Sequence, residues 1–190
     1  TLVFPISYIF GDILTEVYGY GRSRRVIWTG FFCLTLMSGC LFFLSRMPGD
    51  REWQALAGDE KFQAILGSVS NGAIVLASLI AYFLGKFSNS YVLAKLKLYT
   101  AGKWLWTRTI GSTIVGQGID TAAFVLIATV FGVFPWSLFW NLVASNYLFK
   151  VLIEVLLTPA TYRAVAFLKR AEREDYYDHD TNFNPFSLTT

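Results

Sequence analysis

The sequence predicts an all-α integral membrane protein built as a bundle of transmembrane helices. Hydrophobic residues make up 54% of the chain and charged residues only 15%, whereas soluble domains carry about a quarter charged residues. The mean hydropathy is +0.46. Long stretches carry no charge at all, and the basic residues gather in alternate connecting segments. The length of 190 residues fits one transmembrane domain over residues 1–190.

Charge-free runs locate the helices, because a lysine or arginine at bilayer depth costs about 2.5–3.5 kcal/mol on insertion scales. The runs are residues 26–45, 62–83, 109–132 and 137–158, the last two interrupted by one and two charges. Each is close to the ~20 residues that cross ~30 Å of hydrocarbon. Residues 2–17 are shorter, and we interpret them as part of a further membrane segment. Because the chain opens inside an apolar stretch without an initiating Met, we expect a preceding segment to be missing.

The connecting segments predict the orientation. Residues 22–25 contain three arginines, residues 86–108 contain only basic charges, and residues 163–173 are rich in lysine and arginine. Residues 46–61 mix both signs, and residues 133–136 carry none. Basic segments lie on the cytoplasmic side of membranes, so we expect a cytoplasmic C-terminus. Residues 88–98 are too short to span and indicate a cytoplasmic-face helix or a re-entrant piece. Residues 159–177 indicate an interfacial cytoplasmic helix that starts near Pro159, and residues 178–190 an extended cytoplasmic tail.

The third complete run contains Asp120, an acidic residue close to mid-bilayer. Asp120 lies about 18 Å along the helix axis from Arg108, and ionisable groups at that depth usually mark a substrate or ion pathway. Thr113, Gln117 and Asp120 follow the spacing i, i+4, i+7 and therefore share one helix face. The stripe favours a binding site, and the alternative is a set of hydrogen bonds between helices.

Two further polar groups follow helical spacing. Asn146, Lys150 and Glu154 share a face of the last run, where Lys150 and Glu154 could neutralise each other or Asn146 and Lys150 could line the same cavity as Asp120. In the first segment, Asp12 and Glu16 lie four residues apart between Pro5 and Gly19. They indicate either ligand contact or an ion-pair network with Arg22, Arg24 or Arg25.

Asn71 and Arg108 complete the candidate binding residues. Asn71 lies within the run 62–83. Arg108 lies at the mouth of the Asp120 helix and could either bind the substrate or extend its side chain to the membrane interface. The only histidine, His179, lies in the tail, and no metal-ligand or nucleophile motif is present. We therefore expect no cofactor, no metal and no catalytic residues, and the basic segments do not indicate a nucleic-acid partner.

Three stretches resemble the queuosine precursor transporter family, also described as a vitamin uptake family. They are FPISYIFGDILTEVYGY at residues 4–20, LWTRTIGSTIVGQGIDT at residues 105–121 and TNFNPF at residues 181–186. The resemblance implies a six-helix transmembrane bundle with both termini inside, similar to the substrate-binding subunits of energy-coupling-factor transporters. We expect the first of these helices to be missing from the residues given. The resemblance also implies a multi-pass protein of the bacterial inner (plasma) membrane.

The resemblance implies a substrate, 7-cyano-7-deazaguanine or 7-aminomethyl-7-deazaguanine, imported for tRNA queuosine salvage. A guanine-like edge presents an N–H and an exocyclic amine that one carboxylate can accept together. Asp120 is the candidate for that contact and Gln117 for a carbonyl or ring nitrogen, and Asp12, Glu16, Asn71 and Asn146 are candidates to complete the pocket.

Three functional hypotheses follow. The first is an importer of a deazapurine. The second is a substrate-binding subunit, for this or another vitamin-like molecule, that needs a separate energising ATPase module. The third is an intramembrane enzyme that uses the carboxylates of Asp12, Glu16 and Asp120, and the absence of a nucleophile or metal motif disfavours it. The sequence leaves a homo-oligomer open. Asp120 or Glu16 is a candidate to carry a proton, as intramembrane acids do in other carriers.

Overall fold

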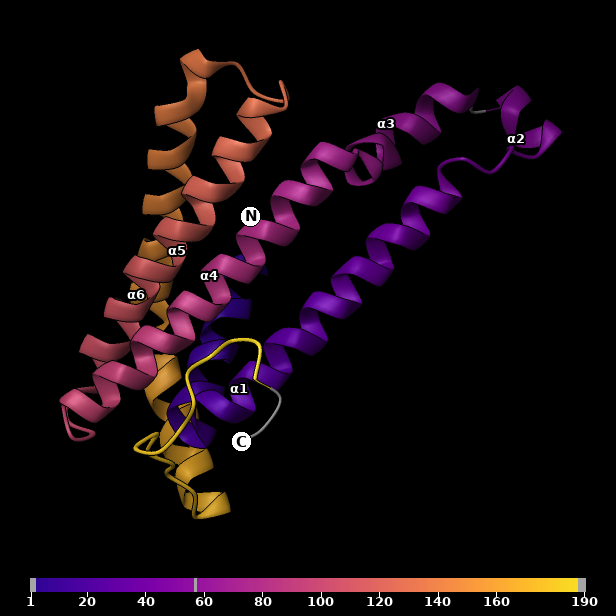
Figure 1. The fold of residues 1–190 in the computed structure, drawn as a ribbon. Coiled ribbons are helices and arrows are strands. Elements are labelled where there is room, and N and C mark those ends of the chain that lie inside the picture. Colours follow the sequence, from indigo (N-terminus) through magenta and orange to yellow (C-terminus); the bar gives the residue numbers. More distant parts are fainter. Residues whose placement is uncertain (1–2, 57, 188–190) are drawn as a thin grey trace.

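The computed structural model describes residues 3–56 and 58–187, and every regular element in this part is a helix (Figure 1). Four helices are long and apolar enough to cross a membrane. The elements are α1 (Val3–Leu44), α2 (Arg51–Leu56), α3 (Gly58–Ser70), α4 (Gly72–Tyr99), α5 (Leu105–Val130), the 3-10 turn η1 (Trp136–Leu138) and α6 (Phe139–Glu172). The prediction of an all-helical membrane protein is confirmed.

Helix α1 consists of two arms that meet at Gly19. Gly19 has φ 82° and ψ 172°, a backbone conformation open essentially only to glycine, and α1 reverses its direction there (Figure 1). The predicted segments 2–17 and 26–45 are these two arms. The C-terminal tail binds both broken ends: the Tyr176 N–H donates to the Val17 carbonyl, and the Asp178 carboxylate accepts from the Tyr20 N–H at 3.0 Å.

Replacing Gly19 with alanine is expected to destabilise the protein by about 1–3 kcal/mol, because an L side chain is strained at this φ and ψ. The new methyl group would also overlap the ring of Tyr176 and lie 3.0 Å from an Asp178 oxygen. The measurement is thermal unfolding in detergent. Gly39→Ala is the matched control, because no atom lies within 4 Å of the methyl group it adds. A Gly19→Ala variant as stable as Gly39→Ala would contradict the expectation.

The membrane-crossing part of α4 differs from the predicted run 62–83. Residues 62–70 belong to α3, Asn71 caps α4, and the apolar helix extends from Gly72 to Tyr99. It includes residues 88–98, which were expected to form a separate piece. The charge-free criterion failed because the lysines of α4 are buried with partners. Lys86 donates to the Ser7 carbonyl and hydroxyl at 2.8 and 3.0 Å, and Lys97 is 1% exposed.

The predicted run 109–132 corresponds to α5 and the run 137–158 to the first part of α6. Helix α6 continues through Pro159 to Glu172, so no separate helix begins near Pro159 as expected. Proline lacks an N–H and leaves a carbonyl of the preceding turn without its helical donor. That carbonyl belongs to Val155, four residues before Pro159, and the Thr158 hydroxyl donates to the adjacent Glu154 carbonyl at 2.9 Å. The helix ends at Glu172, five residues before the predicted end at residue 177, and the described chain beyond it contains no further helix.

The long helices form a ring in which α1 contacts α4 and α6, and α5 contacts the same two helices. Helices α4 and α5 have the most extensive contact, and two glycines allow it. A methyl group added to Gly85 would lie 2.6 Å from the Asp120 Cβ, and one added to Gly116 would lie 2.6 Å from the Asn89 Cβ. Close approach through small residues is typical of packed membrane helices.

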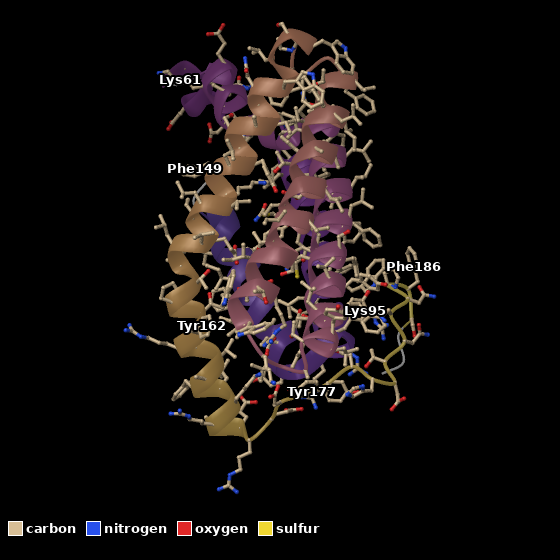
Figure 2. All side chains as sticks on the ribbon, turned by 90° about the vertical axis from the view of Figure 1, so that its left-hand side faces the viewer. Lys61, Lys95, Phe149, Tyr162, Tyr177 and Phe186 are labelled. Atoms are coloured by element: carbon tan, nitrogen blue, oxygen red, sulfur yellow. The ribbon has the colours of Figure 1, made fainter. Side chains whose placement is uncertain are left out.

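Polar side chains occupy the interior of the ring, and large apolar ones cover its outside. Within the described residues, the fully buried side chains include Arg24, Arg108 and Lys97. Phe32, Phe43, Trp140, Leu156 and Phe167 are among the large apolar residues that are more than half exposed (Figure 2). This distribution suits a bundle surrounded by lipid that encloses a polar path.

The basic segments gather at one end of the ring, here called the basic end. The turn at Gly19, the connection between α4 and α5 and the last turns of α6 lie together there (Figure 1). Helices α2 and α3 and the connection between α5 and α6 lie toward the opposite end. The tail then lies along the basic end, where the Arg24 guanidinium donates to the Asn182 and Asn184 carbonyls at 2.7 and 2.8 Å. The structure thus places the basic connections at one end of the ring and the non-basic connections at the other.

Candidate functional site

Two groups of buried polar side chains fill the ring at different depths. The basic-end network consists of Glu16, Lys97, Arg108, Lys169 and Asp175. The central cluster lies about two helical turns deeper and draws on all four long helices. Its members are Tyr8, Asp12, Lys86, Asn89, Thr113, Gln117, Asp120, Lys150 and Glu154.

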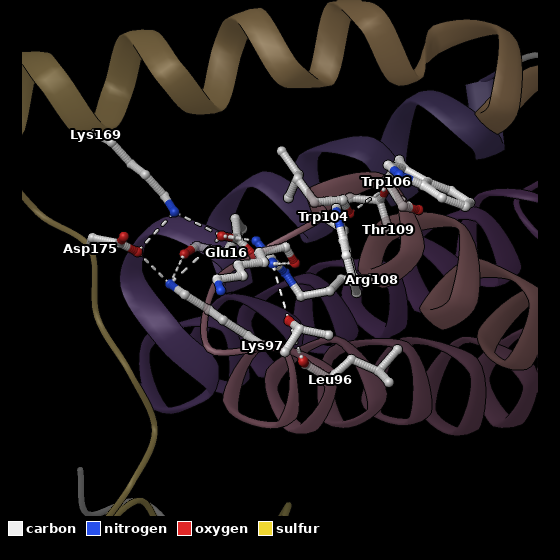
Figure 3. A network of polar contacts seen from close by, with 12 residues as sticks. Glu16, Leu96, Lys97, Trp104, Trp106, Arg108, Thr109, Lys169 and Asp175 are labelled. Carbon is white, nitrogen blue, oxygen red and sulfur yellow. Dashed lines mark hydrogen bonds and ion pairs between the residues drawn. The ribbon is translucent and has the colours of Figure 1, made fainter.

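Glu16 is the centre of the basic-end network (Figure 3). Its side chain is 0% exposed and binds cations from two helices directly: Arg108 through two nitrogens at 2.7 and 3.1 Å, and Lys169 at 2.7 Å. The Lys97 ammonium lies 3.8 Å from the same carboxylate and also donates to the Glu16 backbone carbonyl. The network therefore joins the first arm of α1 to α4, α5 and α6, and it leaves neither oxygen of Glu16 without a donor.

Asp175 adds a second carboxylate to this network from the tail. It lies 2.6 Å from Lys97 and 2.8 Å from Lys169. Partial burial by itself raises the pKa of Asp175, but the hydrogen bonds from Lys169 and Lys97 outweigh burial, and the pKa lies below its usual value. The tail is thus held to the basic end as an anion against two lysines.

In the central cluster, both lysines have polar partners. The Lys150 ammonium lies 2.6 Å from an Asp120 oxygen and 3.3 Å from the Thr121 hydroxyl. The Lys86 ammonium binds Ser7 and lies 3.8 Å from the centre of the Tyr8 ring. The ion pair that the structure gives Lys150 is therefore with Asp120, not with Glu154 as their i, i+4 spacing predicts. A carboxylate on a neighbouring helix competes successfully with one on the same helix.

Several buried atoms of the central cluster have no hydrogen-bond partner among the described residues. Gln117 is 0% exposed, and both its amide nitrogen and its amide oxygen are unpartnered. Buried polar atoms are nearly always paired in native proteins, and leaving one unpaired costs about 1–3 kcal/mol. The other unpartnered atoms of the cluster are the Tyr8 hydroxyl, Asp12 Oδ2, Asn89 Oδ1, the Thr113 hydroxyl and Glu154 Oε2.

Asp12 of α1 and Glu154 of the neighbouring helix α6 bring two carboxyl groups close together inside the ring. Asp12 is 0% and Glu154 2% exposed. The Asn89 amide donates to Asp12 Oδ1 at 2.6 Å, and the Thr113 hydroxyl lies beside Glu154. Donors, acceptors and charged groups from four helices are thus buried together in the interior of the ring. Such a set can bind a small polar molecule through several simultaneous hydrogen bonds.

The structure places most of the predicted site residues in these two groups. Thr113, Gln117, Asp120, Lys150 and Asp12 belong to the central cluster. Glu16 and Arg108 belong to the basic-end network. Glu16 thus forms ion pairs, which was one of the two alternatives, but its partners are not the arginines at residues 22–25 that were expected. Arg22 pairs instead with Glu174 at 2.5 Å.

Two predicted residues lie outside both groups. Asn71 is exposed and accepts from the Ala73 and Ile74 N–H groups as the N-cap of α4. It precedes Asn89 by about 27 Å of helix. The Asn146 side chain donates to the Leu142 carbonyl of its own helix at 2.9 Å and is not hydrogen-bonded to the central cluster within the described residues.

Sequence reasoning did not select Tyr8, Lys86, Asn89 or Glu154 as binding residues. Lys86 and Asn89 were excluded by the assumption that α4 ends before them, and Glu154 by its spacing from Lys150. A usable signal was present for Tyr8: it precedes Asp12 and Glu16 at i, i+4, i+8 on one face of the first arm.

Comparison with known proteins places the chain in a family. Residues 1–164 match the family described as "Putative vitamin uptake transporter". The chain belongs to this family. The "Probable queuosine precursor transporter" of Bacillus subtilis (strain 168) is 28% identical over 167 residues, which are 85% of this chain and 69% of that protein. The "Queuosine precursor transporter" of Escherichia coli (strain K12) is 28% identical over 158 residues, 80% and 65% of the two chains.

A third relative in the vitamin uptake family is the "Probable queuosine precursor transporter" of Haemophilus influenzae (strain ATCC 51907 / DSM 11121 / KW20 / Rd). It is 24% identical over 167 residues, 87% of this chain and 66% of that protein. The chain therefore spans about two thirds of the length of these relatives. No solved structure matches the chain. The relatives are named as transporters and not as enzymes, in agreement with the absence of a catalytic motif.

Proposed function

We propose that this member of the vitamin uptake family imports queuosine precursors, 7-cyano-7-deazaguanine or 7-aminomethyl-7-deazaguanine, for tRNA queuosine salvage. The names of the three relatives support the substrate class. The site that would take the substrate is the central cluster. The observation that carries this assignment is Gln117, whose amide is wholly buried at mid-helix with neither end hydrogen-bonded.

A deazaguanine suits the central cluster chemically. The Gln117 amide offers a donor and an acceptor together, matching a ring carbonyl or nitrogen and a neighbouring N–H. One turn further along α5, Asp120 offers a carboxylate to the N–H and exocyclic amine of the guanine-like edge. The Tyr8 ring provides an aromatic face at the same level, where its hydroxyl packs against Gly85 of α4. Stacking on an aromatic side chain contributes about 1–3 kcal/mol per base.

Replacing Gln117 with leucine is expected to weaken binding of 7-cyano-7-deazaguanine about 5- to 150-fold, through the loss of two hydrogen bonds of about 0.5–1.5 kcal/mol each. The thermal stability of the substrate-free protein should stay the same or rise, because the lost amide has no partner in that state. Binding to the purified protein and uptake in cells that lack their own importer are the two measurements. Unchanged affinity in the Gln117→Leu variant would exclude the central cluster as the substrate site.

Two threonines of α5 supply the matched control. Thr113 and Thr129 are both buried, and neither hydroxyl has a hydrogen-bond partner, but they lie about 24 Å apart along the helix. Thr113→Val should lower substrate affinity, and Thr129→Val should leave it unchanged. Equal effects from the two variants would show that the response comes from packing within α5 and not from substrate contact.

We also propose, from the resemblance, a six-helix bundle similar to the substrate-binding subunits of energy-coupling-factor transporters. The collection of basic segments at one end supports a location in the bacterial inner membrane with that end, and the C-terminus, in the cytoplasm. Reconstitution of the purified protein alone in liposomes tests its independence. Uptake without a partner would exclude a binding subunit that strictly requires an ATPase module.

A further inference from the structure

The contact between Asp12 and Glu154 places two acids of different helices against each other in the interior of the ring. Together they have one strong amide donor, from Asn89 to Asp12 Oδ1 at 2.6 Å. Asp12 Oδ2 and Glu154 Oε2 have no donor at all among the described residues. Two ionised carboxylates in contact repel each other strongly when water is excluded. A proton bound by one of the two carboxyl groups would remove this repulsion.

The charged groups that face the pair neutralise only one of its two possible negative charges. From α4, Lys86 binds Ser7 and stacks over Tyr8. From α6, Lys150 binds Asp120 of α5, and the phenol of Tyr8 on α1 is neutral. Three carboxyl groups therefore meet two ammonium groups, and the cluster is left with one excess negative charge. A net charge at this depth is costly, and one bound proton removes it.

Neighbouring groups show that the pair belongs to a ligand site. The Thr113 hydroxyl beside Glu154 is 0% exposed and unpartnered, and so are both ends of the Gln117 amide one turn away on α5. Glu16 and Asp120, the acids that the sequence singled out as proton carriers, are instead held by cations. The ionised carboxylates of Glu16 and Asp120 each bind a cationic side chain. Two ionised carboxylates at Asp12 and Glu154 would have no cation bound directly to either of them.

We propose that Asp12 and Glu154 form a proton-binding site that holds one shared proton and couples proton movement to substrate import. On loading, an O–H bond forms at one carboxyl oxygen with a proton taken from water on the outer side. On release, that bond breaks and the proton leaves to water on the inner side together with the substrate. No electron transfer is involved. The coupling rests on the proposed transport function, but the proton site itself does not.

Infrared difference spectroscopy of the purified protein in lipid tests the proton site without any substrate. The wild-type protein should show the carbonyl stretching band of a buried, protonated carboxyl group in neutral buffer, and this band should disappear in alkaline buffer. Asp12→Asn and Glu154→Gln should each remove it, since an amide then donates to the remaining carboxylate. Asp175→Asn is the control and should leave the band in place, because Asp175 is ionised against two lysines. A wild-type protein without the band, or a band that survives in both variants, would overturn the proposal.

Uptake into liposomes tests the coupling. With an outside more acidic than the inside, the wild-type protein should concentrate 7-cyano-7-deazaguanine, and collapse of the gradient should abolish accumulation. Glu154→Gln and Asp12→Asn should lose gradient-driven accumulation, and gradient-driven accumulation that persists in both variants would overturn the coupling. Gradient-independent uptake by the wild-type protein would overturn the coupling alone. A wild-type protein that neither binds nor carries the deazapurine would instead refute the proposed function, and the infrared result would still stand or fall by itself.

Discussion

Replacing Glu16 with alanine is expected to lower the free energy of unfolding by about 3–5 kcal/mol, the usual cost of removing one partner from a buried ion pair. Glu16 is 0% and Arg108 1% exposed, and the two form a bidentate pair at 2.7 and 3.1 Å. Without the carboxylate, the Arg108 charge is left inside the bundle with carbonyl and hydroxyl acceptors only. Thermal or denaturant unfolding in detergent measures the loss, and uptake should fall with the amount of folded protein.

Two variants distinguish the buried pair from a general effect of charge at the basic end. Asp175→Asn removes a carboxylate of the same network whose side chain is 41% exposed, and its cost should stay within about 1 kcal/mol. Glu16→Gln combined with Arg108→Met removes both charges, and its cost should be smaller than the sum of the two single changes. Additive costs in the double variant would mean that Glu16 and Arg108 do not stabilise each other.

The parts of the fold that follow from local periodicity were predictable from the sequence. Helix α5 was placed to within a few residues, because the apolar run 109–132 contains only one charge, Asp120. The stripe of Thr113, Gln117 and Asp120 follows from helical spacing alone, and all three side chains are buried on the interior face. The predicted segments 2–17 and 26–45 correspond to the two helical arms that meet at Gly19.

The misplacement of α4 shows what local patterns cannot predict. Lys86 and Lys97 were assigned to a loop because charge is costly in lipid. In the structure their partners are Ser7 and Glu16 on α1 and Asp175 in the tail, far away in the sequence. The contact of Asp12 with Glu154 joins residues 142 positions apart. No spacing rule relates such residues, since only the packing of the helices brings them together.

The two polar groups also differ in how completely their polar atoms are hydrogen-bonded or ion-paired, and this difference indicates different roles for the two groups. In the basic-end network each carboxylate binds two cations or more, and a fully satisfied network rigidifies the structure around it. The central cluster keeps unpartnered atoms on Gln117 and Thr113, at a cost in stability that a bound ligand can offset. Local rules of stability tend to be violated at functional sites. The depth of a polar group in the membrane does not by itself indicate whether that group binds a ligand.

Asp120→Asn is expected to abolish uptake and also to lower the free energy of unfolding by about 3–5 kcal/mol, because it leaves Lys150 buried without its carboxylate. This variant alone cannot separate the counterion of Lys150 from a residue that contacts the substrate. The double variant Asp120→Asn, Lys150→Met removes both charges from the ion pair. It should recover most of the lost stability in thermal unfolding.

Uptake should not return in the double variant if Asp120 accepts the N–H and amine of a deazaguanine, because a neutral asparagine offers only one acceptor oxygen where a carboxylate offers two. We therefore expect a stable, correctly inserted protein whose affinity for 7-cyano-7-deazaguanine stays at least about 10-fold weaker than that of the wild type, the effect of 1.4 kcal/mol. Lys150→Met by itself reports the contribution of the lysine. Recovery of uptake together with stability would reduce Asp120 to a counterion and transfer the recognition of the substrate to Gln117 and its unpartnered neighbours.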